Sequence, residues 1–132
     1  MKDWSKKRYW IVGASEGLGL ALAQKMSEAG ASLILTARNE ARLKEIASTL
    51  PNEVEVLPLD ITDLNAVRKS KKRLKNVDGF IFSAGEYWPM PAQHWDIEKI
   101  KSMIDVNIIL SLIHISEPTR PLYISYAVFC LK

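Results

Sequence analysis

The chain has 132 residues, of which 48% are hydrophobic and 25% are charged, so its length allows one domain and its composition excludes a disordered or fibrous protein. The formal net charge of +3 is too small to indicate a nucleic-acid partner by itself. Because there is no apolar run of about 18 residues, no signal-peptide pattern and only one cysteine, Cys130, we expect a cytoplasmic protein that does not bind membranes.

Short apolar strands alternate with amphipathic helices over the first 109 residues. Apolar runs predict strands at residues 8–12, 32–37, 54–57 and 79–83, and helical spacing predicts helices at residues 17–29, 39–50, 63–75 and 96–109. Gly30 and Pro51 are typical helix-ending residues. Since the strands are continuously apolar, they predict a doubly wound α/β fold in which helices cover both faces of a parallel sheet.

This pattern ends near Ile109. Pro118 and Pro121 would stop a further helix. Residues 110–120 and 124–132 resemble the translation of two stretches of a DNA-sequencing adapter, in one frame and in the right order. We therefore expect an incomplete domain at residues 1–109 and a non-native tail at residues 110–132, which is left out of fold reasoning. The alternative is a divergent natural C-terminus.

A glycine motif with the spacing G-x-x-x-G-x-G joins the first predicted strand to the first predicted helix. Glycine allows unusual backbone angles and lets the chain approach a pyrophosphate closely, and the N-terminus of a helix favours negative charge. The residues that we expect to bind are Gly13, Ser15, Glu16, Gly17, Leu18 and Gly19. Taken alone, the motif is equally consistent with a tight turn that binds nothing.

Three further motifs follow in order: Asp60-Ile61 after the third predicted strand, Ser83-Ala84-Gly85 after the fourth, and Asn107 in the next helix. Together with the glycine motif, they resemble the short-chain dehydrogenase/reductase family over roughly residues 8–109. The resemblance implies a Rossmann-like sheet with strand order 3-2-1-4, truncated after about four strands. It also implies an oxidoreductase that transfers hydride between NAD(P)H and a carbonyl or alcohol of a small molecule.

The same resemblance assigns roles to individual residues. Asp60, with Ile61 beside it, would accept a hydrogen bond from the adenine amino group, and Ser83, Ala84 and Gly85 would line the adenosine. Ser83 replaces an asparagine that the family often has, which keeps the backbone role and alters one side-chain hydrogen bond. Asn107 would hold a water in a proton relay. The alternatives are a turn or N-cap role for Asp60 and a structural amide that supports the glycine loop for Asn107.

Arg38 follows the second predicted strand, where a carboxylate would select the ribose 2′-hydroxyl of NADH. A guanidinium there can pair with a 2′-phosphate through two hydrogen bonds, or it can simply be a solvated surface arginine. Glu16 stands where relatives that prefer NADPH often carry a basic residue, and its charge opposes a phosphate. We expect NADP(H) as the cofactor, with NAD(H) as the alternative.

The family's other catalytic residues, a serine and a Tyr-x-x-x-Lys pair, are not found in this sequence. The residues four positions after each tyrosine are Gly13, Pro91, Ala127 and Cys130. We therefore expect this chain to be inactive and the intact gene product to be a homo-oligomeric enzyme acting on a small molecule. The alternative function is a dinucleotide-binding module without catalysis.

Weaker signals remain. The basic run at residues 68–75 is typical of a solvated helix face, and we expect no nucleic-acid partner. His94 and His114 have no acidic or cysteine neighbours at ligand spacing, so we expect no metal site. Aromatic side chains after the fourth predicted strand would flank a substrate pocket, or pack against the end of the sheet or a neighbouring subunit: Tyr87, Trp88 and Trp95.

Overall fold

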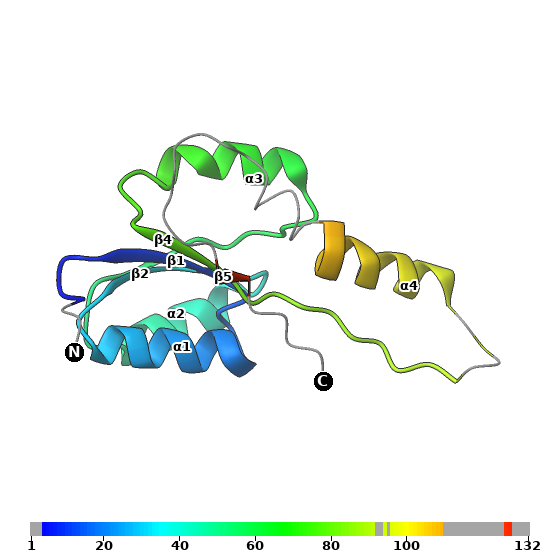
Figure 1. Cartoon of the computed structure of the whole chain (residues 1–132), viewed down its shortest axis with the longest axis horizontal. Helices are drawn as coiled ribbons and strands as arrows, with labels where there is room; N and C mark the ends of the chain where they lie inside the picture. The colour runs from blue at the N-terminus through cyan, green and yellow to red at the C-terminus, as the bar shows by residue number, and fades with distance from the viewer. Residues whose placement is uncertain (1–3, 92–93, 95, 110–125, 128–132) are drawn as a thin grey trace.

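The computed structural model describes residues 4–91, 94, 96–109 and 126–127. Within them, α-helices and β-strands alternate along the chain as in Figure 1. The elements are β1 (Arg8–Val12), α1 (Gly17–Glu28), β2 (Ser32–Thr36), α2 (Glu40–Thr49), β3 (Val54–Val56), α3 (Leu64–Ser70), the 3₁₀ turn η1 (Lys71–Arg73), β4 (Gly79–Phe82), α4 (Ile97–Ile104), the π-helical segment η2 (Asp105–Ile109) and β5 (Tyr126–Ala127).

The strands form one parallel sheet with the order β3-β2-β1-β4-β5. The predicted order of the first four strands is therefore confirmed. Strand β5, which comes from the segment set aside as non-native, adds two residues to the β4 edge, with Ile81 opposite Tyr126 and Phe82 opposite Ala127. The sequence did not predict this strand because its segment had been excluded from fold reasoning.

Alternate residues of the central strands feed two separate cores, because successive side chains of a strand point to opposite faces. Helices α1 and α2 cover one face, where Ile11, Leu33 and Leu35 are completely or almost completely buried (Figure 1). Helix α3 covers the other face, over Trp10 and Ile34. The predicted layering, with helices on both faces of the sheet, is confirmed.

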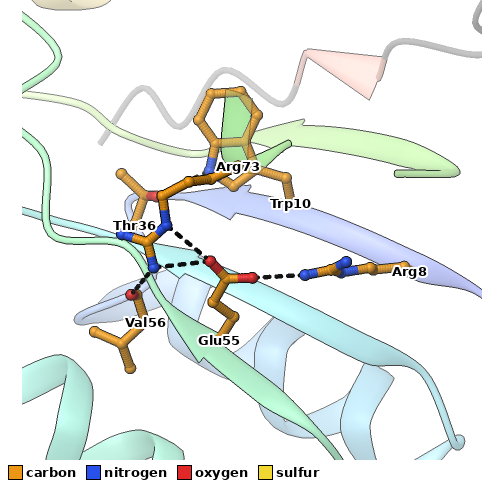
Figure 2. A network of polar contacts seen from close by, with 6 residues as sticks. All are labelled: Arg8, Trp10, Thr36, Glu55, Val56 and Arg73. Atoms are coloured by element: carbon orange, nitrogen blue, oxygen red, sulfur yellow. Dashed lines mark hydrogen bonds and ion pairs between the residues drawn. The ribbon is translucent and has the colours of Figure 1, made fainter. Parts of the chain in front are cut away.

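Polar contacts connect strand β3, at the edge of the sheet, to strand β1 and to η1 (Figure 2). The Glu55 carboxylate accepts hydrogen bonds from Arg8 Nη2 at 2.6 Å and from Arg73 Nε at 3.0 Å. Arg73 also donates to the Val56 carbonyl oxygen at 3.3 Å. Deeper in the sheet, Trp10 Nε1 donates to Thr36 Oγ1 at 2.9 Å, so the buried indole N–H has a partner. Arg73, part of the basic run, therefore has a structural role.

Two helices differ from their predicted extent. Helix α3 ends at Ser70 and tightens into η1, whereas helical spacing predicted a helix to residue 75. The run carries like charges three and four residues apart, such as Arg68 with Lys71 and Lys72, and such pairs destabilise an α-helix. Helix α4 ends at Ile104 and passes into η2.

The apolar face predicted for residues 96–109 is present, but the described part of the chain does not bury it. The exposed fraction of Ile97 is 75% and that of Ile104 is 44%, and Figure 1 shows α4 to the side of the sheet. Ile97 and Ile104 therefore lie on the surface of the described part of the chain. None of the described helices combines the length and hydropathy that a membrane crossing requires.

Candidate functional site

The glycine loop between β1 and α1 is packed against the chain that follows β4. Gly13 has a φ of +84°, and a Cβ added to it would lie 2.5 Å from the backbone nitrogen of Ala84. A Cβ on Gly19 would lie 2.0 Å from the carbonyl oxygen of Gly13 and 2.4 Å from Ser83 Oγ. Both glycines are therefore required by close contact within the protein.

Gly17 differs from these two glycines. Its φ is +57°, and a Cβ built on it meets no described atom within 4 Å. It begins α1, whose N-cap residue, Glu16, makes no side-chain capping hydrogen bond, whereas Asn39, Asp63 and Asp96 cap the three other described α-helices. The first backbone bond of α1 runs from Leu20 N to the Glu16 carbonyl oxygen at 3.3 Å. Helix α1 thus begins without a side-chain cap and with open space beside Gly17, which suits an anion.

Ser83 joins the glycine loop to β4. Its hydroxyl lies 3.1 Å from the Val12 carbonyl oxygen and 3.3 Å from that of Gly13, to which it can donate, and its backbone N–H donates to Val12 at 2.8 Å. The serine therefore holds the loop in place where the family often has an asparagine. Ala84 and Gly85 continue from it along the same edge of the sheet.

A cleft of about 290 Å³ lies beside this loop, over the start of α2. It brings together two predicted loop residues, Ser15 and Glu16, with the predicted Arg38. Sequence reasoning missed its two other lining residues, Asn39 and Arg42. The signal that points to them is the capping position of Asn39, because a residue three positions after an N-cap lies in the first helical turn beside it.

Asp60 lies after β3 and takes part in a turn. Its Oδ1 accepts hydrogen bonds from the backbone N–H and the hydroxyl of Thr62, at 2.9 and 2.7 Å. Partial desolvation acts to raise the pKa of Asp60, but the two Thr62 hydrogen bonds and the positive charge of Arg38 outweigh it and lower the pKa below 3.8. Asp60 is thus an exposed, ionised carboxylate near Arg38. Ile61 is only 8% exposed and packs in the core beneath α3.

Asn107 lies in η2 and holds the segment after β4. Its Nδ2 donates to the Glu86 carbonyl oxygen and its Oδ1 accepts from the Glu86 N–H, both at 2.8 Å. A Cβ on Gly85 would lie 3.5 Å from the same Oδ1. Ser102 of α4 also donates to the Glu86 carboxylate. The amide therefore supports residues 85–86 directly, at the end of the strand next to the glycine loop.

A second hollow of about 340 Å³ lies between α4 and the segment that follows Glu86. The predicted Tyr87 and Trp88 line it together with Ile100 and Met103, and the Lys99 ammonium lies 5.4 Å from the centre of the Trp88 ring. Trp95 lies outside the described residues. Among the residues that are described, no group of three or more His, Cys, Asp or Glu is arranged to hold a metal ion.

These features lie at the carboxyl ends of parallel strands, where open α/β sheets bind their ligands. A sequence model of the family described as short chain dehydrogenase matches residues 7–124. The chain belongs to the short-chain dehydrogenase family. The matched range includes part of the segment that was set aside as non-native.

The curated relatives that the chain resembles are named as oxidoreductases or reductases. An uncharacterized oxidoreductase of Staphylococcus epidermidis is 35% identical over 115 residues, which cover 84% of this chain and 50% of the relative. Sulfoacetaldehyde reductase 2 of Chromohalobacter salexigens is 38% identical over 118 residues, which cover 83% of this chain and 47% of the relative. This short-chain dehydrogenase chain spans about half the length of the curated relatives it matches.

Solved structures share its fold. A short-chain type dehydrogenase/reductase from Mycobacterium marinum superimposes with a TM-score of 0.75 at 25% identity, over 84% of this chain and 48% of that one. A short chain dehydrogenase/reductase family protein gives a TM-score of 0.79 at 21% identity, over 87% of this chain and 49% of that one. The Rossmann-like fold that the resemblance implied is thereby confirmed.

Proposed function

We propose that residues 8–109 bind NADP(H) as part of a short-chain oxidoreductase whose intact form transfers hydride between the dinucleotide and a carbonyl or alcohol of a small molecule. The observation that carries this proposal is the glycine loop. Its helix lacks a side-chain cap, its Gly17 faces open space, and the cleft that contains Arg38 lies directly beside it. A pyrophosphate at the start of α1 and a ribose phosphate at Arg38 fit this arrangement.

Each residue then has one task. The first-turn N–H groups of α1 bind the pyrophosphate, Arg38 binds the 2′-phosphate, and the ionised Asp60 accepts from the adenine amino group. The bound dinucleotide supplies the hydride chemistry. Glu16 lines the same cleft and opposes the phosphate, so NADP(H) binding depends on the arginine outweighing it. NAD(H) is the alternative cofactor.

The proposed substrate-binding region lies after β4, next to the glycine loop. We infer that Asn107 orders a water for proton transfer while it holds Glu86, and that the hollow beside Tyr87 and Trp88 takes part in substrate binding. One relative is named a sulfoacetaldehyde reductase, which supports a small carbonyl compound as the substrate class.

We propose that residues 110–132 do not belong to the native protein, and that the missing serine and Tyr-x-x-x-Lys lie in the native continuation. The adapter resemblance and the coverage of only half of each relative support this. Reading the source DNA beyond the codon for Ile109 tests it. A genome that encodes Leu110 to Lys132 would overturn this part of the proposal and favour a binding module without catalysis.

Cofactor binding is tested on the chain itself. We expect isothermal titration to show binding of NADPH, with weaker binding of NADH. Asp60→Asn keeps the size of the side chain but makes it a weaker hydrogen-bond acceptor. We therefore expect it to weaken the binding of both dinucleotides equally. A folded chain that binds neither dinucleotide would contradict the proposed function.

We also predict that the chain shows no reductase turnover with any aldehyde or ketone, because it lacks a tyrosine–lysine pair for proton transfer. The measurement is NADPH consumption at 340 nm with a panel of carbonyl compounds, with Asn107→Ala as the control for contaminating enzyme. Turnover that is lost in that variant would show the prediction to be wrong.

Cytoplasmic localisation and a homo-oligomeric intact protein are further proposals. Residues 1–109 contain no cysteine and so no disulfide, which suits a reducing compartment. Cell fractionation and light scattering on the intact gene product test these two proposals.

A further inference from the structure

We propose that Arg42 is a second cation for the 2′-phosphate of the dinucleotide, and that Glu45 competes with the phosphate for it. This inference rests on the proposed function and identifies a residue that decides cofactor choice. Both residues lie within α2 and belong to no glycine or strand-end motif.

The position of Arg42 in the first turn of α2 brings it to the cleft. Arg42 is the third residue of α2, and its N–H donates to Asn39 Oδ1 at 3.0 Å, which fixes the first turn of the helix. Its side chain, 43% exposed, lines the same cleft as Arg38. The two arginines thus line the cleft from the end of β2 and from the first turn of α2, while Glu16 provides the opposing charge.

Each arginine also interacts with a carboxylate of the protein. Arg42 Nη1 lies 2.7 Å from Glu45 Oε2, and Arg38 interacts with the charge of Asp60. The Arg42–Glu45 pair is exposed on both sides, at 43% and 65%, and such a pair changes an equilibrium constant by no more than about fivefold. A hydrogen bond between a guanidinium and a phosphate contributes about tenfold or more. The phosphate therefore displaces Glu45 from Arg42.

This exchange predicts a specific pattern. A ligand without a 2′-phosphate makes no hydrogen bond to Arg42, so replacing the arginine leaves the affinity for that ligand unchanged. Loss of the Glu45 charge frees Arg42 and raises the affinity for 2′-phosphate ligands alone. A residue that merely stabilised α2 would alter both ligand types together.

The test uses the 132-residue chain, with adenosine 2′,5′-bisphosphate and 5′-AMP as probes and isothermal titration as the readout. For Arg42→Leu we expect about a tenfold or greater loss of bisphosphate affinity, with 5′-AMP changed by less than about twofold. For Glu45→Gln we expect bisphosphate affinity to rise by about two- to threefold, with 5′-AMP unchanged. Arg68→Leu removes the same charge from α3 and is the matched control.

The outcomes separate this inference from the proposed function. If the chain binds neither probe nor dinucleotide, both are overturned. If it binds dinucleotides and Arg42→Leu leaves the ratio of the two probe affinities within about twofold of the unaltered chain, the inference alone fails. Circular dichroism shows whether Arg42→Leu folds. If it does not fold, Glu45→Gln decides, and an unchanged ratio there overturns the inference.

Discussion

Three glycines of one loop have different physical reasons to be glycine. Gly13 and Gly19 are confined by neighbouring backbone, whereas Gly17 needs its positive φ but has open space beyond its Cα. The first two therefore allow the close packing of the loop, and the third allows its turn at an open surface. The spacing of the motif does not separate these tasks, because it shows only that glycine occurs three times.

We predict that Gly19→Ala destabilises the chain more than Gly17→Ala does. The added Cβ would meet the Gly13 carbonyl oxygen at 2.0 Å, so the loop must shift, at a cost of about 1–3 kcal/mol in unfolding free energy. We expect NADPH binding to be lost as well. Urea unfolding followed by tryptophan fluorescence measures the stability change.

Gly17→Ala is the matched comparison. It meets only backbone strain, of about 1 kcal/mol, because no described atom lies near the new methyl group. If it destabilises the chain as much as Gly19→Ala does, the assignment of Gly19 to close packing is wrong.

At the scale of elements, side-chain contacts connect strand ends to the segments that carry the site. Asn107 joins η2 to the chain after β4, and Ser102 joins α4 to the same residue, Glu86. The Lys7–Asp78 pair joins the starts of β1 and β4 at the opposite end of the sheet. Side-chain contacts thus connect neighbouring elements at both ends of the sheet.

Asn107→Ala is expected to release residues 85–86. It leaves the half-buried N–H and carbonyl group of Glu86 without their amide partner, which costs about 1–3 kcal/mol. Hydrogen exchange checks this, since the Glu86 amide is expected to lose protection. Ser102→Ala is the control, because it removes a contact of the Glu86 side chain and leaves that N–H bonded. Unchanged exchange in Asn107→Ala would refute the structural role.

The Lys7–Asp78 pair makes a pH-dependent contribution to stability. A hydrogen bond from Lys7, together with the Arg8 N–H, lowers the pKa of Asp78 below 3.8, and the hydrogen bond to Asp78 raises the pKa of Lys7 above 10.5. The contribution of Asp78 is therefore complete above pH 3.8 and is lost as the pH falls through its folded pKa. That of Lys7 is complete below pH 10.5 and is lost as the pH rises further.

Asp78→Asn tests this linkage. At pH 7 we expect the Tm to fall by about 1–3 °C, because the pair is partly exposed. The difference from the unaltered chain should vanish in strong acid, where Asp78 is protonated. Thermal unfolding between pH 2 and 7 measures it, and a difference that stays constant with pH would contradict the ion pair.

At the scale of the whole molecule, the sheet and the region around α4 differ in how well their apolar side chains are buried. The sheet core under α1, α2 and α3 is buried, whereas large apolar side chains around α4 are exposed: Tyr87, Trp88, Ile97 and Ile104. Exposed apolar side chains gathered in one region are typical of a surface that another part of a protein covers.

We predict that the chain binds the dye 8-anilinonaphthalene-1-sulfonate strongly at this region and tends to associate. Ile97→Lys replaces the most exposed of these isoleucines and is expected to lower both dye fluorescence and association, measured by light scattering. Lys101→Ala, an exposed change on the same helix, is the control. A monomer that does not bind the dye would show the prediction to be wrong.

Local patterns alone predicted the first four strands, the helices on both faces and the position of the glycine loop. Apolar runs and helical spacing report which residues avoid water. Gly13 and Gly17 report backbone angles that other residues rarely adopt, and Gly19 reports a position with no room for a side chain. These are properties of neighbouring residues. The order of the first four strands came from the family resemblance, which the structure confirmed.

Only the tertiary structure decided which distant groups meet. It placed Arg42 in the cleft with Ser15 and Arg38, bonded Asn107 to Glu86, packed Ile61 into the core and left the apolar face of α4 uncovered. No sequence period contains this information, because the contacts join residues whose separation along the chain is unrelated to their distance in space. The local pattern therefore determined the scaffold and its glycine turn, and long-range packing determined the charges and contacts around that turn.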